Sequence, residues 1–92
     1  MSAETSISLN EQANRYELSL GQERVGELVY RDHGETRVFL HTEVDPAHRG
    51  KGLASKLIAW ALDDTRDAGL HLRVECPAVT EYLKDHPEAD FR

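Results

Sequence analysis

The 92-residue sequence is poor in cysteine and has no long hydrophobic run. Its single cysteine, Cys76, excludes an intrachain disulfide, and its first residues have neither the basic nor the apolar segment of a signal peptide. No apolar stretch approaches the roughly 18 residues of a membrane-spanning helix. We therefore expect a cytoplasmic chain with no membrane partner.

Positive charge is scarce as well. Eleven Lys and Arg residues stand against 17 Asp and Glu residues, which gives a formal net charge of -6. A nucleic-acid binder usually needs a basic face, so we expect no nucleic-acid partner. The exception is local, because residues 46–62 contain no acidic side chain but include His48, Arg49, Lys51 and Lys56. This acid-free segment indicates a site for a negatively charged ligand.

Alternation of apolar and polar residues predicts four strands, at 15–20, 24–31, 36–44 and 70–75. In the third of these, Val38, Leu40 and Val44 are expected on one face, with Phe39, His41 and Glu43 on the other. The polar residues 1–13 lack a firm period, so we expect a frayed terminus there rather than an edge strand.

Two helices are predicted between and after these strands. Apolar residues recur at helical spacing over about 50–68, and Pro77 suits the first turn of a shorter helix at about 78–85. The order β-β-β-α-β-α indicates a single α+β domain over residues 1–92. A helix that joins two strands of one sheet normally places them parallel.

The segment between the third strand and the main helix combines glycines with basic residues. Gly50 and Gly52 let the backbone approach a ligand closely, and a helix start offers unpaired N–H groups and a positive dipole end. Arg49 and Lys51 add full charges, so the segment predicts a site for a pyrophosphate or a similar anion. The spacing fits neither the Walker pattern nor GxGxxG. The alternative is that the glycines only shape a tight turn with a solvated basic rim.

These residues carry a resemblance to a known family. Arg49-x-x-Gly52-x-Ala54 resembles the acetyl-coenzyme A signature of the GNAT N-acetyltransferase superfamily, Gln/Arg-x-x-Gly-x-Gly/Ala. Over about residues 15–88 the chain also resembles the minimal single-domain GNAT-like proteins of about this length. That likeness rests on His41-Thr42-Glu43-Val44-x-Pro46-x-x-Arg49-Gly50-Lys51-Gly52, on Cys76-Pro77, on Tyr82 and on His86-Pro87-Glu88.

The resemblance implies an N-acetyltransferase that uses acetyl-coenzyme A as co-substrate and an unidentified amine as acceptor. Backbone N–H groups of residues 50–54 would hold the pyrophosphate, and residues 43–45 would pair with the pantetheine arm where the third and fourth strands splay apart. The implied binding residues are Val44, His48, Arg49, Gly50, Lys51, Gly52, Leu53 and Ala54. The superfamily's usual N-terminal helical region commonly helps to build the acceptor pocket, and we expect no counterpart of it before the first predicted strand. The alternative function is therefore a coenzyme A-binding or interaction module without efficient transferase activity.

Cys76 is the first candidate for catalysis. It precedes a helix-opening proline, and a helix N-terminus stabilises a thiolate that would accept the acyl group and pass it on. The alternative is a small buried hydrophobe, because Cys76 continues the apolar face of Leu72 and Val74. Direct attack by the amine would need no covalent intermediate.

Three further side chains are candidates for proton transfer. His41 is a candidate base, because an ordinary histidine has a pKa of ~6.5, and Glu43 on the same face would orient it or share that role. The alternative for His41 is an exposed surface histidine. Tyr82 is the residue that the resemblance implies as general acid, and its alternative is a place in the core. The remaining histidines show no metal-ligand spacing, so we expect no metal.

Overall fold

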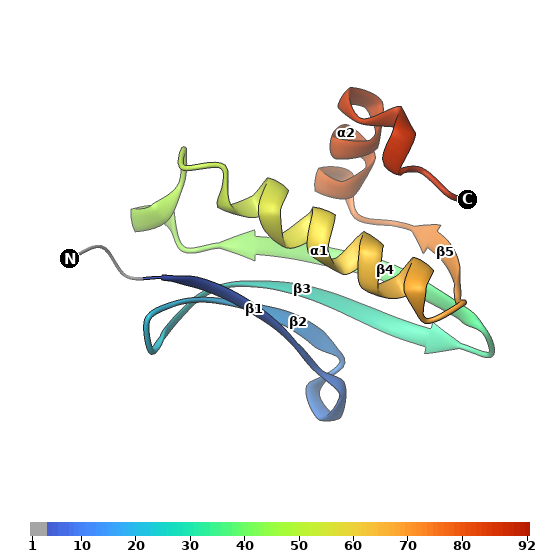
Figure 1. The fold of residues 1–92 in the computed structure, drawn as a ribbon, viewed down its shortest axis with the longest axis horizontal. Coiled ribbons are helices and arrows are strands. Elements are labelled where there is room, and N and C mark those ends of the chain that lie inside the picture. Colours follow the sequence, from blue (N-terminus) through green and yellow to red (C-terminus); the bar gives the residue numbers. More distant parts are fainter. Residues whose placement is uncertain (1–3) are drawn as a thin grey trace.

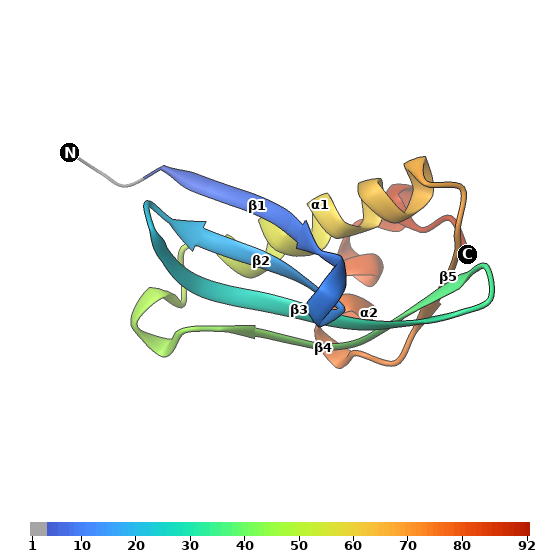
Figure 2. The ribbon, with the colours of Figure 1, turned by 90° about the horizontal axis from the view of Figure 1, so that it is seen from below.

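Five strands form one mixed sheet in the computed structural model, which describes residues 4–92 (Figures 1 and 2). They lie side by side in chain order: β1 (Thr5–Asn10), β2 (Arg15–Leu20), β3 (Glu23–His33), β4 (Thr36–Val44) and β5 (His71–Val74). Neighbouring strands are antiparallel except β4 and β5, which are parallel. The α+β class and the parallel pairing across the main helix are both confirmed.

Two α-helices lie on one side of the sheet: α1 (Leu53–Asp67) and α2 (Pro77–Asp85). Three short 3-10 helices complete the described residues: η1 (Glu11–Ala13), η2 (Pro46–His48) and η3 (Pro87–Ala89). The main helix begins three residues later than predicted, because Gly50 and Gly52 adopt left-handed φ angles of 80° and 73°. None of the described helices is long and apolar enough to cross a membrane.

The core lies between α1 and the sheet. The apolar stripe of α1 packs on β2, β3, β4 and β5, because its apolar residues recur at helical spacing. Buried on the sheet side are Tyr16, Leu18, Leu28, Tyr30 and Phe39, and on the α1 side Leu57, Ile58, Ala61 and Leu62. The helix α2 adds Val79 and Leu83 to the same core.

A bulge in β4 makes the predicted face assignment wrong. Val29 pairs with His41 and Tyr30 with Phe39, so Leu40 is an extra residue in β4. The bulge shifts the alternation, as an extra residue must. Phe39 is fully buried in the core together with Val44, whereas His41 is exposed. Phe39 and Val44 therefore share the core face, and His41 and Glu43 lie on the opposite face.

The strands β4 and β5 part halfway along β4, as predicted. Their pairing runs from Thr36 opposite His71 to Phe39 opposite Val74, and a last bond links the Glu75 N–H to the Phe39 carbonyl at 2.9 Å. Beyond this point β4 continues to Val44 while the chain turns into α2 (Figure 1). Within the described residues, the β4 edge from Leu40 to Val44 has no strand partner on that side.

The expectation of a frayed terminus is wrong for residues 5–10. They form the edge strand β1, which pairs along its whole length with β2. Ile7 and Leu9 are partly buried at the margin of the core. The polar composition of the segment did not indicate this burial. Residues 1–3 lie outside the described part of the chain.

Candidate functional site

The connection from β4 to α1 is a tightly bonded turn followed by a glycine-rich loop. Asp45 begins it: its side-chain Oδ1 accepts a hydrogen bond from the Ala47 N–H at 3.0 Å, and its carbonyl accepts from the His48 N–H at 2.8 Å. The following residues, Arg49 to Gly52, lead into α1. The turn at residues 45–48 ends β4 and leads the loop at residues 49–52 to the start of α1.

The N-terminus of α1 has no side-chain cap. Gly52 occupies the cap position, and the Lys56 N–H makes the bond to its carbonyl at 3.2 Å. The N–H groups of Leu53, Ala54 and Ser55 precede that bond, so they have no partner within the helix. The first turn also contains no acidic residue. Such a helix end favours an anion, which would accept these N–H groups and lie at the positive end of the dipole.

A hollow of about 120 Å³ lies at this helix end. It is lined by Val44, His48, Arg49, Gly50, Gly52, Leu53, Ala54 and Ser55. All the residues predicted for coenzyme A binding except Lys51 line it. Ser55 was missed by the sequence analysis, although its place as the third residue of the helix marks it as an N–H donor.

Gly50 and Gly52 contribute to this hollow through their backbone conformation and their lack of a side chain. Both have φ angles that L side chains rarely adopt, and a Cβ added at either one would meet no other atom within 4 Å. The space beside Gly50 and Gly52 is therefore open. The hollow lined by Val44, His48, Arg49, Gly50 and residues 52–55 thus offers N–H groups, open space and basic side chains together, and we call it the cradle.

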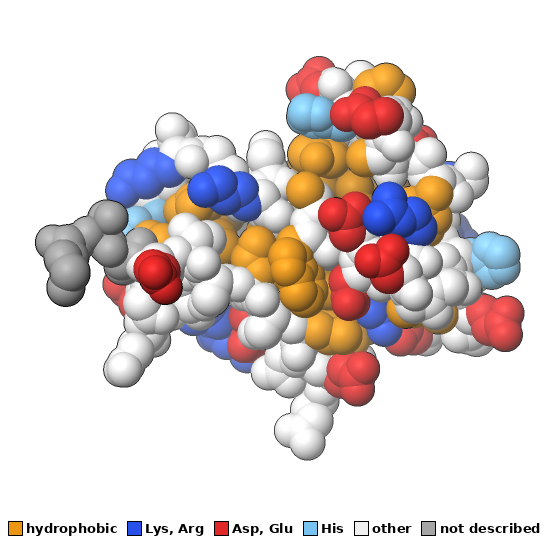
Figure 3. All heavy atoms as spheres, viewed as in Figure 1, with side chains coloured by type: hydrophobic (Ala, Val, Ile, Leu, Met, Phe, Trp, Pro, Cys, Tyr) orange, Lys and Arg blue, Asp and Glu red, His pale blue; other side chains and the backbone are white. Residues whose placement is uncertain are grey.

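The surface charge over the cradle differs from the rest of this face. Figure 3 shows Lys and Arg side chains over the segment between η2 and α1, whereas Asp and Glu side chains gather toward the other end of α1. The contrast follows from the acid-free segment 46–62. An anion approaching the cradle meets a locally positive surface on a negatively charged chain.

Cys76 lies beside the open edge of β4. Its Sγ is 3.3 Å from the Thr42 Oγ1, and the residue is only 2% exposed. Cys76 has the extended backbone expected before a proline and takes the cap position of α2, but its side chain makes no capping bond. The thiol is thus buried between β4 and α2, next to the place where the strands part.

His41 and Glu43 lie on the other side of the sheet from this thiol. Their side chains approach each other, with the Nε2 to Oε2 distance at 3.3 Å, and each is 59% exposed. Thr42, the residue between them, points to Cys76, and successive strand residues point to opposite faces. The structure therefore brings His41 and Glu43 together but does not bring either of them to Cys76.

Tyr82 lines a second hollow, of about 290 Å³, between α1 and α2. This hollow shares Ala54 and Ser55 with the cradle, so the two are adjacent across the first turn of α1. The Tyr82 ring stacks on His86 with centroids 4.3 Å apart. Burial raises the pKa of Tyr82, and the nearby Glu88 and Asp63 raise it further. Its hydroxyl is therefore protonated at neutral pH.

One group of metal-ligating side chains occurs in the described residues. Glu23, Asp45 and His48 each place a ligand atom within 4.8 Å of the others. The sequence analysis expected no metal because it considered only spacing along the chain, and these residues come from two distant segments.

Comparison with known proteins places the chain in a family. A model of the GCN5-related N-acetyl-transferase family matches residues 15–91. Protein NATD1 of Homo sapiens is 38% identical over 61 residues, which cover 65% of this chain and 54% of the human protein. Protein NATD1 of Gallus gallus is also 38% identical over 61 residues, 65% of this chain and 56% of its own. The chain thus spans about half the length of the curated relatives that it matches.

Two solved N-acetyltransferase structures have the same fold as this chain. The ribosomal-protein-S18-alanine N-acetyltransferase from Escherichia coli superposes with a TM-score of 0.69 at 14% identity, covering 85% of this chain and 54% of that one. A GCN5-like putative N-acetyltransferase from Staphylococcus aureus has a TM-score of 0.69 at 20% identity, covering 91% of this chain and 82% of that one. At these identities the structures establish the fold alone. The family model, which matches residues 15–91, shows that this chain belongs to the GCN5-related N-acetyltransferase family.

Proposed function

We propose that the chain binds acetyl-coenzyme A and transfers its acetyl group to an amine. The observation that carries this proposal is the uncapped N-terminus of α1, which opens onto the cradle of Gly50 and Gly52. The pyrophosphate accepts from the N–H groups of Gly52 to Ser55, and Arg49 adds a charge-assisted contact. Lys51 does not line the hollow, and its role is long-range attraction of the anion.

The open edge of β4 suits the pantetheine arm. The arm contains amide groups, and the edge from Leu40 to Val44 has no strand partner among residues 4–92 on the side away from β3, where it presents main-chain N–H and carbonyl groups. Val44 belongs to both this edge and the cradle hollow. A ligand that binds its pyrophosphate at α1 is thereby directed along β4 towards the point where β5 diverges.

For the transfer itself we propose direct attack by the amine from the exposed face of β4. The amine nitrogen forms a bond to the thioester carbonyl carbon, the C–S bond breaks, and the coenzyme leaves as a thiolate. His41, paired with Glu43 on that face, takes the proton that the amine loses. Tyr82 remains a candidate proton donor to the thiolate, because its raised pKa keeps the phenol protonated.

The route through Cys76 is the alternative mechanism. It requires the thiol to leave a site where it is 2% exposed and to lose its contact with Thr42. Direct attack requires no such rearrangement, so we favour it. Intact-protein mass spectrometry after mixing with acetyl-coenzyme A tests whether Cys76 carries the acyl group.

Calorimetry with coenzyme A and variants of Gly52 tests the cradle. Gly52→Asp places a carboxylate at the phosphate site, and we expect at least tenfold weaker binding. Gly52→Asn tolerates the left-handed conformation and carries no charge, so it separates charge from backbone strain. Gly69→Asp is the matched control, because Gly69 has a φ of 75° and open space around it at the opposite end of α1. Equal binding by Gly52→Asp and Gly69→Asp would overturn the site.

Activity is tested separately by thiol release from acetyl-coenzyme A with a panel of amines. Release that depends on the amine supports the transferase. Tight binding without release above background would instead support the coenzyme A-binding module, the second function that the sequence allows. The side chains of His41 and Glu43 are each 59% exposed, so these candidate bases lie at an open surface rather than in an enclosed pocket. This exposure favours the coenzyme A-binding module as the second function.

A further inference from the structure

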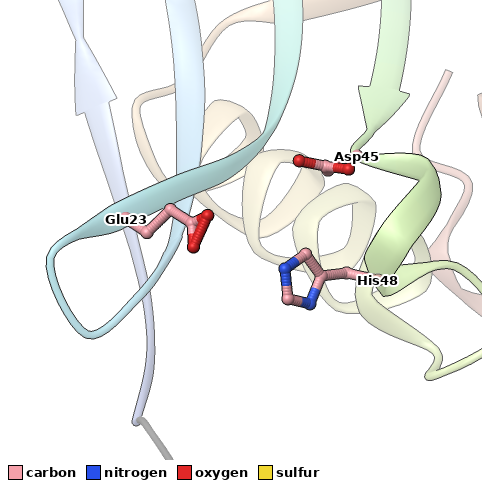
Figure 4. Close-up of side chains that lie close together, drawn as sticks. All are labelled: Glu23, Asp45 and His48. Carbon is pink, nitrogen blue, oxygen red and sulfur yellow. The ribbon is translucent and has the colours of Figure 1, made fainter.

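Glu23, Asp45 and His48 form a group that the proposed acetyl transfer does not use as a unit. Glu23 begins β3, Asp45 follows β4, and His48 ends η2. The three side chains point into one common space (Figure 4), and their nearest ligand atoms all lie within 4.8 Å of one another. From this geometry we propose that they form a zinc-binding site.

The backbone holds two of these residues in place. The Asp45 N–H donates to the Val25 carbonyl at 2.7 Å, which fixes the end of β4 beside the start of β3 and so beside Glu23. The His48 N–H donates to the Asp45 carbonyl at 2.8 Å, which closes the turn that brings the imidazole back to the carboxylates. The positions of Asp45 and His48 therefore follow from the β3–β4 ladder and the η2 turn, and Glu23 lies beside them at the start of β3.

The carboxylate charges at this group are only partly compensated by the protein, since the Asp45 Oδ1 accepts a hydrogen bond from the Ala47 N–H at 3.0 Å. Two carboxylates face the same space, yet none of the three side chains forms a salt bridge with any residue in the range 4–92. The His48 Nδ1 is buried and has no hydrogen-bond partner there. The ring nitrogen that faces the carboxylates in Figure 4 is Nε2, so Nε2 is the ligand atom of the proposed site. A bound cation would relieve the repulsion between Glu23 and Asp45.

The donor set selects the kind of cation. One imidazole nitrogen and two carboxylate oxygens are ligands that zinc accepts, with a fourth position for water. Zinc–ligand bonds of about 2.0–2.2 Å place tetrahedral donor atoms roughly 3.4 Å apart, whereas the three ligand atoms lie within 4.8 Å of one another. Zinc binding therefore requires the exposed carboxylates of Glu23 and Asp45 to move towards the imidazole. Magnesium prefers six oxygen ligands in octahedral geometry, so it should bind much more weakly here. A bound ion would link the β2–β3 hairpin to the turn that leads into the cradle.

The test is titration of the tag-free chain with Zn²⁺ alone, by calorimetry in a buffer without phosphate. We expect one site, with affinity reduced at least tenfold in Glu23→Gln and in His48→Gln. Glu35→Gln and His71→Gln are matched controls, because both residues are exposed and lie at the opposite end of the sheet, where they should leave binding unchanged. Glu23 is exposed and outside the coenzyme cradle, so its variant folds and keeps coenzyme A binding in the absence of metal.

A second measurement locates the ion. Zinc bound at this group slows amide hydrogen exchange in residues 45–49, because it ties η2 to the hairpin. The proposal is overturned if Glu23→Gln binds Zn²⁺ as tightly as the parent, if the two control variants lose affinity equally, or if binding leaves exchange in η2 unchanged. Neither measurement involves coenzyme A, so the zinc site and the proposed transferase function stand or fall separately.

Discussion

The Arg37 Nη1 donates a 2.8 Å hydrogen bond to the hydroxyl of Tyr16, inside the core between the sheet and α1. The same guanidinium binds Asp32 through two parallel bonds, at 2.7 and 2.8 Å. The Tyr16 hydroxyl in turn donates to Asp64 of α1 at 2.9 Å. This chain of contacts ties β2 and β4 to the helix whose opposite end forms the cradle.

Arg37→Met should lower the free energy of unfolding by roughly 2–3 kcal/mol, because it leaves the Tyr16 hydroxyl and two carboxylates without their charged partner. Urea unfolding measures the loss, with an unchanged m-value. Arg66→Met is the control: its ion pairs with Asp63 and Asp67 are exposed, so we expect a loss below about 0.5 kcal/mol. Similar losses in both variants would contradict a stabilising role for the buried network.

Alkaline pH should destabilise the chain through Tyr16. Burial raises the pKa of Tyr16 to about 12, above its usual value of about 10. The unfolded chain therefore releases the phenol proton first as pH rises, and stability that is fully present below pH ~10 is lost between there and about pH 12. The loss is of the order of 2 kcal/mol.

Comparison of the parent with Tyr16→Phe isolates this effect from the titration of lysines. The difference in urea midpoint between the two proteins should be constant from pH 7 to 9 and should shrink above pH 10. A difference that stays constant up to pH 11.5 would mean that Tyr16 ionises equally easily in the folded and unfolded chains.

Pantetheine should bind much more weakly than coenzyme A. It lacks the pyrophosphate, so it makes no contact with the N–H groups at the start of α1 and keeps only the pairing along β4. We expect at least a tenfold loss in calorimetry, and a weaker dependence on salt than coenzyme A shows. Equal affinities would place recognition in the open edge of β4 instead of the cradle.

Cys76→Ala should cost about 1–2 kcal/mol of stability, because it removes a buried sulfur that packs against Thr42. Under direct attack by the amine, this variant keeps its turnover, and intact-protein mass spectrometry after brief mixing with acetyl-coenzyme A shows no adduct on the parent. A Cys76-dependent mass gain that disappears when an amine is added would establish the two-step route.

The sequence by itself determined most of the elements and the segment that lines the cradle. Strands β2 and β4 have the predicted bounds, and α2 differs by one residue, because alternation and helical spacing are local properties of the chain. The cradle was predictable for the same reason. Its lining residues all fall between Val44 and Ser55, so one contiguous segment contains the glycines, the basic residues and the helix start.

The tertiary structure decided what depends on the pairing of distant segments. The bulge at Leu40 arises from the register between β3 and β4, and it alone determines that Phe39 enters the core and His41 leaves it. The edge strand β1 forms by pairing with β2, and its Ile7 and Leu9 side chains pack against the core. Likewise, the hydrogen bond between Arg37 and Tyr16 and the proximity of Glu23 to His48 join residues that are far apart in the sequence, so no local sequence pattern predicts them. An apolar period of two or 3.6 residues determines which side chains share a face within one strand or helix. The contacts named above depend instead on how whole elements pack together.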